Sequence, residues 1–236
     1  MTTKQVIEEI KKAGSESIKK IHLKHGAKEP FYGVKVEDLK KIQKKIKENQ
    51  QQIALELFSS GIGDAQYLAG LMADGAKMSK QALHQWAEGA EWQMISEYSV
   101  AWVASEHPEA FEIGLKWIDS KKPHVAAAGW NTISSVMATR ADEMLDMAAL
   151  KKLLVRVEKE IDKAPNRVKY CMNGFVIAAG SFVKELTSLA TATGKKIGNV
   201  EVDMNGTSCK VPFAPDYIKK VADKGYLGKK KKTVKC

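Results

Sequence analysis

The sequence predicts an all-α fold in which pairs of short helices stack on one another. Apolar residues recur at i, i+3 and i+4 steps through almost the whole chain, which places them on one face of a helix. Two stretches that begin with proline, Pro123–Trp130 and Pro165–Phe175, have similar patterns, and Val125 and Val168 within them lie 43 residues apart. A repeat of this length predicts structural units that stack on their neighbours along the chain.

The individual helices are expected to be short and to end at glycine or proline. In chain order, the clearest apolar stripes lie at residues 6–10, 36–46, 53–58, 113–118 and 150–161. The breaks between helices lie at Gly61-Ile62-Gly63, His107-Pro108, Lys122-Pro123 and Ala164-Pro165, where proline can open the next helix. Helices of about 10 to 16 residues with this interval are typical of HEAT-like repeats, so we expect an α/α superhelix.

One segment near the C-terminus departs from the helical pattern. Residues 200–211 alternate in polarity around Asn205-Gly206, which predicts a small β-hairpin. A short helix is expected over 215–224, and the lysine-rich residues after it cannot bury apolar area, so they are expected to be mobile. The predicted organisation is a solenoid over 1–195, a hairpin and short-helix extension over 196–227, and a mobile tail over 228–236.

Composition excludes several classes of protein. The chain of 236 residues is 44% hydrophobic and 28% charged, close to the globular average, so it is neither disordered nor collagen-like. No apolar run reaches the eighteen or so residues of a membrane span, and the start does not resemble a signal peptide, so we expect a cytoplasmic protein. Three widely spaced cysteines without a CxxC pair, and five histidines without HExxH, predict no disulfide framework and no metal site. The sequence has neither GxGxxG nor GxxxxGK, so we expect no nucleotide cofactor.

The charge points to a polyanionic partner. The net charge is +10, and only three of the 38 basic residues are arginine. Residues 1–47 carry +7, residues 48–115 carry −8 and residues 116–236 carry +11. Lysines suit phosphate contact better than base reading, so DNA or RNA held by its backbone is the first expectation. The alternative is that runs such as Lys40, Lys41, Lys44 and Lys45 are only the solvated faces of amphipathic helices.

Three motifs resemble those of the HEAT-like-repeat DNA alkylation repair proteins. The first is His22–Ala27 followed by Phe31–Ile42, with its Tyr-Gly-Val and Leu-Lys-Lys-Ile elements. The second is Trp92 followed by Ser105–Glu109, and the third is Asn173-Gly174-Phe175 at the head of a late repeat helix. Together the motifs span most of residues 1–190, and the hairpin with its lysine tail looks like an extension found in one branch of the family.

The resemblance implies a helical solenoid that holds duplex DNA, with members that excise cationic N3- or N7-alkylated purines. Such a base is a good leaving group, so the enzyme mainly stabilises an oxocarbenium-like sugar and positions a water molecule. By this resemblance the partner is alkylated duplex DNA, and we expect a monomer that needs no cofactor.

The catalytic pattern of the family transfers to this chain with substitutions. By resemblance Trp92 is the first tryptophan, Phe175 stands at the second tryptophan position, and Ala127 stands where the family has an arginine. Ser96 occupies the position of the aspartate, and Glu97 would replace that acid only if the helix changes register, since one residue rotates a side chain by about 100°. Trp92 has the alternative interpretation of an aromatic in the repeat core.

The candidate DNA-binding residues lie in three places. Arg167, Lys169 and Asn173 open the helix that carries Phe175, where free N–H groups can hold phosphate. Lys35 lies in the first motif, which can equally be a fixed turn of a solenoid cap. The tail adds Lys229, Lys230, Lys231 and Lys232.

Two other functions remain open at this stage. The first is a binding module that holds DNA or structured RNA and performs no chemistry, which the residues at Ser96 and Ala127 favour. The second is a protein–protein scaffold that docks through the acidic residues 48–115.

Overall fold

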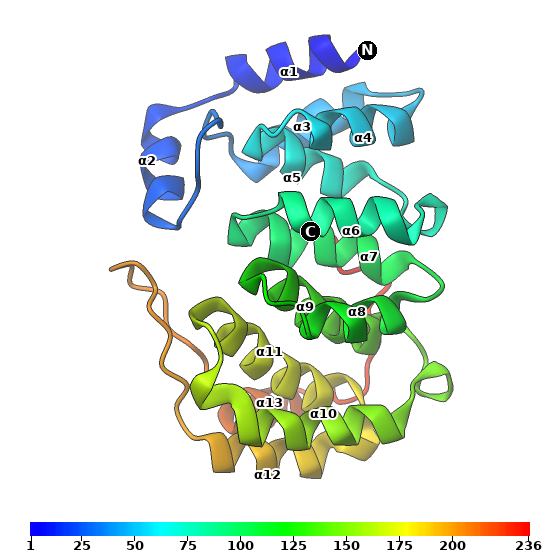
Figure 1. Ribbon diagram of the computed structural model, residues 1–236, viewed down its shortest axis with the longest axis vertical. Helices are drawn as coiled ribbons and strands as arrows, with labels where there is room; N and C mark the ends of the chain where they lie inside the picture. Colours follow the sequence, from blue (N-terminus) through cyan, green and yellow to red (C-terminus); the bar gives the residue numbers. More distant parts are fainter. The chain divides into compact units, whose positions relative to one another are not determined.

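The computed structural model describes residues 1–236, and every regular element in it is a helix (Figure 1). The all-α prediction is therefore confirmed. The chain divides into two compact units. Unit 1 comprises Met1–Pro108 with Met204–Thr207 and Lys235–Cys236, and unit 2 comprises Glu109–Asp203 with Ser208–Val234. Segments of the expected extension and tail are divided between the units, with Met204–Thr207 and Lys235–Cys236 in unit 1 and Ser208–Val234 in unit 2.

Unit 1 is built around a helix that is buried on every side. Its elements are α1 (Thr3–Lys12), α2 (Glu16–Lys24), α3 (Val36–Lys45), α4 (Gln50–Ser59), α5 (Gly63–Met72), η1 (Gly75–Lys77), α6 (Lys80–Gly89), η2 (Met94–Val100) and α7 (Ala101–Glu106). All ten residues of α5 are buried, and α1, α3, α4 and η2 pack on it. The remaining helices of the unit are amphipathic and cover this centre.

Local signals explain where several of these helices begin. Thr2 and Gln5 form a capping box at α1, in which each side chain bonds to the backbone of the other residue. The Ser79 side chain accepts the Ala82 N–H at the start of α6. The break at Gly61-Ile62-Gly63 lies where the sequence predicts it, between α4 and α5.

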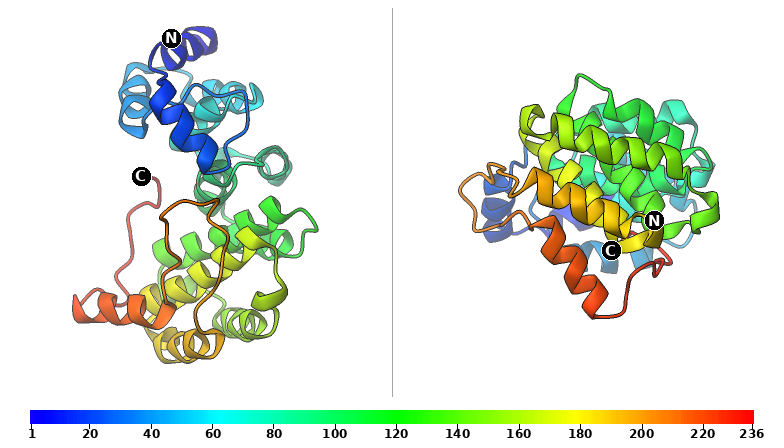
Figure 2. Two further views of the ribbon diagram at one scale, coloured as in Figure 1. Left: turned by 90° about the vertical axis from the view of Figure 1, so that its left-hand side faces the viewer. Right: turned by 90° about the horizontal axis from the view of Figure 1, so that it is seen from below.

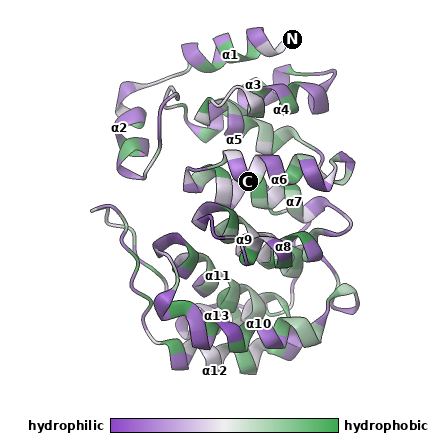
Figure 3. Ribbon diagram, viewed as in Figure 1, coloured by the Kyte–Doolittle hydropathy of each residue, from purple (hydrophilic) through white to green (hydrophobic).

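Unit 2 is centred on two long helices that pack against each other. Its elements are α8 (Ala110–Ile118), α9 (Pro123–Thr139), η3 (Asp142–Met144), α10 (Met147–Glu160), η4 (Ile161–Lys163), α11 (Asn166–Phe182), η5 (Lys184–Leu186), α12 (Thr187–Ile197) and α13 (Ala214–Asp223). Helix α9 packs on α8 and α11, and α11 packs on α12 and α13. The colouring of Figure 3 shows that these helices carry both apolar and polar residues.

The predicted β-hairpin is wrong, although its turn is present. Asn205 and Gly206 have φ of 54° and 69°, and the Thr207 N–H donates to the Met204 carbonyl oxygen at 3.1 Å, as in a type I′ turn. No strands flank this turn (Figure 2). The Asp203 backbone bonds instead to the Asn166 side chain, through its N–H at 2.7 Å and its carbonyl at 2.8 Å. The Asn205-Gly206 pair therefore specifies the turn. Hydrogen bonds from Asp203 to the start of α11 stand in place of the strand pairing that a hairpin would have.

The lysine-rich tail, expected to be mobile, packs against helix ends. In unit 2, the Lys230 ammonium donates to the carbonyls of Met137 at 2.8 Å and Phe182 at 2.9 Å, near the C-termini of α9 and α11, and pairs with Asp142 at 2.7 Å. In unit 1, the Lys235 ammonium pairs with Glu106 at 2.8 Å. The last carbonyls of a helix have no partner within the helix and carry partial negative charge, so they attract ammonium groups.

The chain holds neither a cluster of metal-ligating side chains nor a helix of membrane-spanning length. No group of three or more His, Cys, Asp or Glu side chains could hold a metal ion. No single helix is long and apolar enough to cross a membrane, and α11 and α12, which reach that length only together, meet at a bend of 116°. None of the three cysteines forms a disulfide; Cys171 is buried, and Cys209 and Cys236 are exposed.

Candidate nucleic-acid interface

Trp92 belongs to an aromatic cluster inside unit 1. Only 8% of its surface is exposed, and its indole N–H donates to the His25 carbonyl at 3.1 Å. Its ring lies 5.3 Å from the ring of His22 and 6.2 Å from that of Phe31, measured between centroids. The structure therefore supports the alternative interpretation of Trp92 as a core aromatic, because a side chain held in this way does not offer its face to a deoxyribose.

Ser96 and Glu97 also lie inside unit 1. The Ser96 N–H donates to the Trp92 carbonyl at 3.0 Å, an ordinary α-helical bond, so Ser96 is the residue one turn after Trp92. A π-helix begins at Met94 and widens the turns that follow, but this change of register does not place Glu97 in the position of Ser96. Glu97 is 2% exposed, so its carboxylate lies away from solvent.

Phe175 lies in the core of unit 2. It is completely buried, and its ring meets that of Trp130 edge to face at 5.1 Å. Ala127 is buried in α9 of the same unit, so the arginine that the family pattern expects has no counterpart at that position. The four residues expected to be catalytic are therefore divided between the units. Trp92, Ser96 and Glu97 lie in unit 1, Phe175 lies in unit 2, and all four are buried.

The first turn of α11 has the features expected of a phosphate-binding helix start. Arg167 and Lys169 are partly exposed there, and the Arg167 guanidinium lies 4.3 Å from the centroid of the Tyr170 ring. The side chain of Asn166 is occupied by the Asp203 backbone. Asn173 does not join this group, because it lies in the second turn of α11 and is 1% exposed.

The remaining predicted DNA-binding lysines differ in how available they are. Lys35 is exposed at the start of α3. Lys230 is held by its two carbonyls and Asp142, so its charge serves the fold. Lys229 and Lys231 are exposed and lie over the rings of Tyr226 and Phe182 at 4.5 and 5.4 Å. Lys232 is exposed as well.

A further basic site in unit 2 was not predicted from the sequence. A cavity of about 400 Å³ lies where the first turns of α9 and α11 approach each other. Lys121, Lys159 and Lys163 line it with exposed ammonium groups that make no ion pair in the structure, whereas Arg156 is paired with Asp119 and Glu160. These lysines lie on three separate segments, so no sequence motif joins them.

The fold concentrates the positive charge in unit 2. Unit 2 carries a net charge of +8 and unit 1 a net charge of +2. Three acidic residues of 48–115 are paired with lysines within unit 1, in the pairs Lys28–Glu91, Lys77–Asp74 and Lys235–Glu106. Asp64 and Glu97 are buried, so these pairs and this burial reduce the number of free carboxylates that a scaffold could present.

The comparisons with known proteins match this architecture. The family model described as DNA alkylation repair enzyme matches residues 4–190. The chain belongs to the DNA alkylation repair enzyme family. The family match runs from α1 to the first turn of α12, and it ends before the Asn205-Gly206 turn, α13 and the tail.

Relatives of this family member match most or all of its length. The uncharacterized protein Lin0241 of Listeria innocua is 30% identical over 211 residues, and the uncharacterized protein Lmo0209 of Listeria monocytogenes is 29% identical; each match covers 87% of this chain and 90% of the relative. A solved structure is similar at a TM-score of 0.91 and 35% identity, with both chains covered completely. It represents a new family of proteins related to the HEAT-like repeat DNA glycosylases, with affinity for branched DNA structures. The prediction of HEAT-like repeats is confirmed by this likeness.

Proposed function

We propose that the chain binds DNA, with affinity for branched structures, and does not excise alkylated bases. The observation that carries the proposal is the burial of Trp92 and Phe175, the two aromatic residues that would have to press on a deoxyribose. Ser96 adds a second argument, because a serine hydroxyl is a much weaker general base than the aspartate it replaces.

Charge supports the binding part of the proposal. Unit 2 carries +8, and its unpaired Lys121, Lys159 and Lys163 stand beside two helix N-termini. Ammonium groups and free N–H groups neutralise phosphate without reading bases. Such groups suit a partner defined by its shape, and the structural relative at 35% identity has affinity for branched DNA.

The other candidate is an alkylpurine glycosylase that uses Glu97 in place of aspartate. For this function, the Glu97 carboxylate would have to leave its buried position or be reached by substrate inside unit 1. The family to which the chain belongs favours this candidate, since its members are described as repair enzymes. The geometry at Trp92, Ser96 and Phe175 favours binding without catalysis.

The test is single-turnover release of 3-methyladenine and 7-methylguanine from methylated duplex DNA, at protein concentrations where anisotropy shows the DNA to be bound. We expect binding and no release above the protein-free control. Release above that control would overturn the non-catalytic part of the proposal. In that case, loss of release in Glu97→Gln would assign the chemistry to Glu97.

A matched pair of variants tests the binding part. The triple variant of Lys121, Lys159 and Lys163 to glutamine removes three charges at the cavity, and the triple variant of Lys195, Lys210 and Lys220 to glutamine removes three exposed charges elsewhere in unit 2. The slope of log affinity against log salt concentration should fall by about 1 for each lysine–phosphate pair that a variant removes. We expect this fall in the first variant only, and equal slopes in the two variants would refute the assignment.

A further inference from the structure

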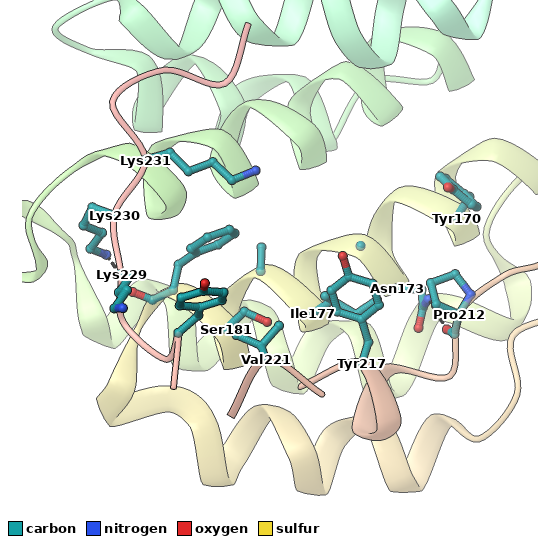
Figure 4. Close-up of a pocket in the computed structure, with 14 residues that line it drawn as sticks. Tyr170, Asn173, Ile177, Ser181, Pro212, Tyr217, Val221, Lys229, Lys230 and Lys231 are labelled. Carbon is teal, nitrogen blue, oxygen red and sulfur yellow. Dashed lines mark hydrogen bonds between the residues drawn. The ribbon is translucent and has the colours of Figure 1, made fainter. Parts of the chain in front are cut away.

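A second cavity in unit 2 lies beside α11, α13 and the tail, and its lining shares no residue with the first cavity. Its volume is about 600 Å³, and four aromatic side chains contribute to its lining. Figure 4 shows Tyr170 and Pro212 at one end, Lys229, Lys230 and Lys231 at the other, and Tyr217 between them. The cavity is large enough for a small organic ligand. Two of its walls, α13 and the tail, lie beyond the family match at residue 190.

Two buried polar atoms of α11 in this cavity have no hydrogen-bond partner. They are Oδ1 of Asn173 and Oγ of Ser181, in side chains that are 1% and 2% exposed. The Asn173 amide N–H donates to the Pro212 carbonyl at 2.9 Å, which fixes the orientation of the side chain and leaves the oxygen as an acceptor. A buried polar atom without a partner costs free energy, so each atom indicates a group that a ligand would supply.

The rest of the lining specifies what that ligand is. Tyr217 and Tyr226 are exposed by 46% and 53%, unusual for large aromatic residues, and both line the cavity. The Lys229 ammonium lies over the Tyr226 ring, so Tyr217 offers the surface on which a planar ring can stack. Lys229 and Lys231 bring positive charge to the end where the Gly228 N–H bonds the Ser181 carbonyl. Eight residues of α-helix, about 12 Å, separate Asn173 from Ser181, which is comparable with a nucleotide from its base edge to its phosphate.

We propose that this cavity binds one nucleotide, with the base against Tyr217 and the phosphate at the lysine end. A base N–H donates to Asn173 Oδ1, and the phosphate accepts from Ser181 Oγ and the Lys229 and Lys231 ammonium groups. The nucleotide is either a free mononucleotide or an unpaired nucleotide of a DNA strand, since both carry the same ring, sugar and phosphate. The inference goes beyond the proposed DNA-binding function and does not require it.

Gly174 offers a way to close the cavity without harming the fold. A Cβ at this position has no neighbour within 4 Å, and the residue lines the cavity from α11. Leucine there places a bulky side chain in the cavity, where it obstructs a ligand, and also favours the helix over glycine. The matched control is Ser188→Leu, which places the same side chain at an exposed position of α12 outside the cavity.

The experiment is isothermal titration of the full chain with each of the four deoxynucleoside monophosphates, the corresponding nucleosides and inorganic phosphate. We expect saturable binding of at least one nucleotide at one site per chain, weaker binding of its nucleoside, and loss in Gly174→Leu but not in Ser188→Leu. Tyr217→Ala should weaken binding by about tenfold or more, since stacking on an aromatic contributes that much per base. Absence of nucleotide binding to the wild-type chain, or binding that inorganic phosphate competes equally well, would overturn a free mononucleotide as the occupant.

A second arm distinguishes the two sources of the nucleotide. The fluorescence of 2-aminopurine is followed at an unpaired position of a gapped DNA and at a paired position of the matching duplex. Quenching at the unpaired position that disappears in Gly174→Leu assigns the cavity to a nucleotide of DNA, even where free nucleotides do not bind. The proposal is refuted if the titration shows no nucleotide binding and the 2-aminopurine fluorescence does not change. If Gly174→Leu keeps the DNA affinity of the wild-type chain, DNA binding does not depend on this cavity.

Discussion

Asp64 shows how one buried carboxylate fixes the loop between α2 and α3. The residue is 2% exposed, and its carboxylate accepts the backbone N–H groups of Tyr32 at 2.5 Å, Gly33 at 3.3 Å and Val34 at 2.8 Å. These three hydrogen bonds to the Asp64 carboxylate fix the backbone of the Tyr-Gly-Val element in the first motif. The motif therefore has a structural role, as expected of a fixed turn at a solenoid cap.

Replacing Asp64 by alanine should destabilise the chain by about 2–4 kcal/mol, because buried N–H groups are left without their acceptor. Asp64→Asn keeps one acceptor oxygen and should cost less. Urea denaturation followed by circular dichroism measures both. If Asp64→Ala unfolds within about 0.5 kcal/mol of the wild-type free energy, the loop does not depend on this carboxylate.

His22 makes stability depend on pH. Burial lowers the pKa of its imidazole below the usual 6.5, a neighbouring Asp64 opposes the shift, and His25 adds to it. Since the unfolded chain binds this proton first, the free energy of unfolding should fall as pH drops below 6.5, until the folded-state pKa has been passed. His22→Phe should reduce this dependence while keeping a ring against Trp92. Melting curves of both proteins across this range test the prediction, and identical pH profiles would contradict it.

At the scale of elements, the crossing of α8 and α9 depends on glycine. A Cβ at Gly129 would lie 2.7 Å from the Ile118 backbone nitrogen and 2.9 Å from the Gly114 carbonyl oxygen, and backbone atoms cannot move aside as a flexible side chain can. These helices therefore pack more closely at position 129 than any larger residue allows.

Gly129→Ala should therefore destabilise the chain by about 1–3 kcal/mol through overpacking. Gly174→Ala in α11 is the matched control, since its Cβ meets nothing within 4 Å, and it should gain up to about 1 kcal/mol from helix propensity. Urea midpoints of the two variants should lie on opposite sides of the wild-type value. Equal urea midpoints for Gly129→Ala and Gly174→Ala would mean that α8 and α9 move apart to accommodate the added methyl group without loss of stability.

The tail stabilises the C-terminal ends of α9 and α11 through the Lys230 ammonium group. Lys230→Met removes two bonds to helix carbonyls and the pair with Asp142, whereas Lys232→Met removes an exposed charge from the same lysine run. We expect a loss of about 1–3 kcal/mol in the first variant and almost none in the second. Thermal melting distinguishes them. Equal melting temperatures would restore the sequence prediction of a solvated tail.

For the molecule as a whole, the sequence predicted what local signals determine. Proline and glycine breaks indicated the helix boundaries near Gly61 and Pro123, because such residues act on their own turn. The hairpin prediction failed because the Asp203 backbone bonds to Asn166, 37 residues away. Burial of Phe175 and the gathering of Lys121, Lys159 and Lys163 are products of tertiary packing, so neither could be predicted from neighbouring residues.

Charge distribution is the other property of the whole chain that bears on function. The sequence suggested two basic thirds and an acidic middle, and the fold converts these into a nearly neutral unit 1 and a strongly basic unit 2. An asymmetric field of this kind attracts polyanions and raises their rate of association. A partner bound through its phosphates is consistent with that field, whether or not chemistry follows.

The most direct test of branched-DNA recognition compares affinity for a four-way DNA junction with affinity for a linear duplex of the same sequence, at 50 and 200 mM salt. We predict tighter binding of the junction at both concentrations, and, for six or more phosphates bound, a decrease in affinity on the order of a thousandfold between them. Equal affinity for the two DNAs, or an affinity that does not change with salt, would contradict the proposal that this family member recognises branched DNA through its phosphates.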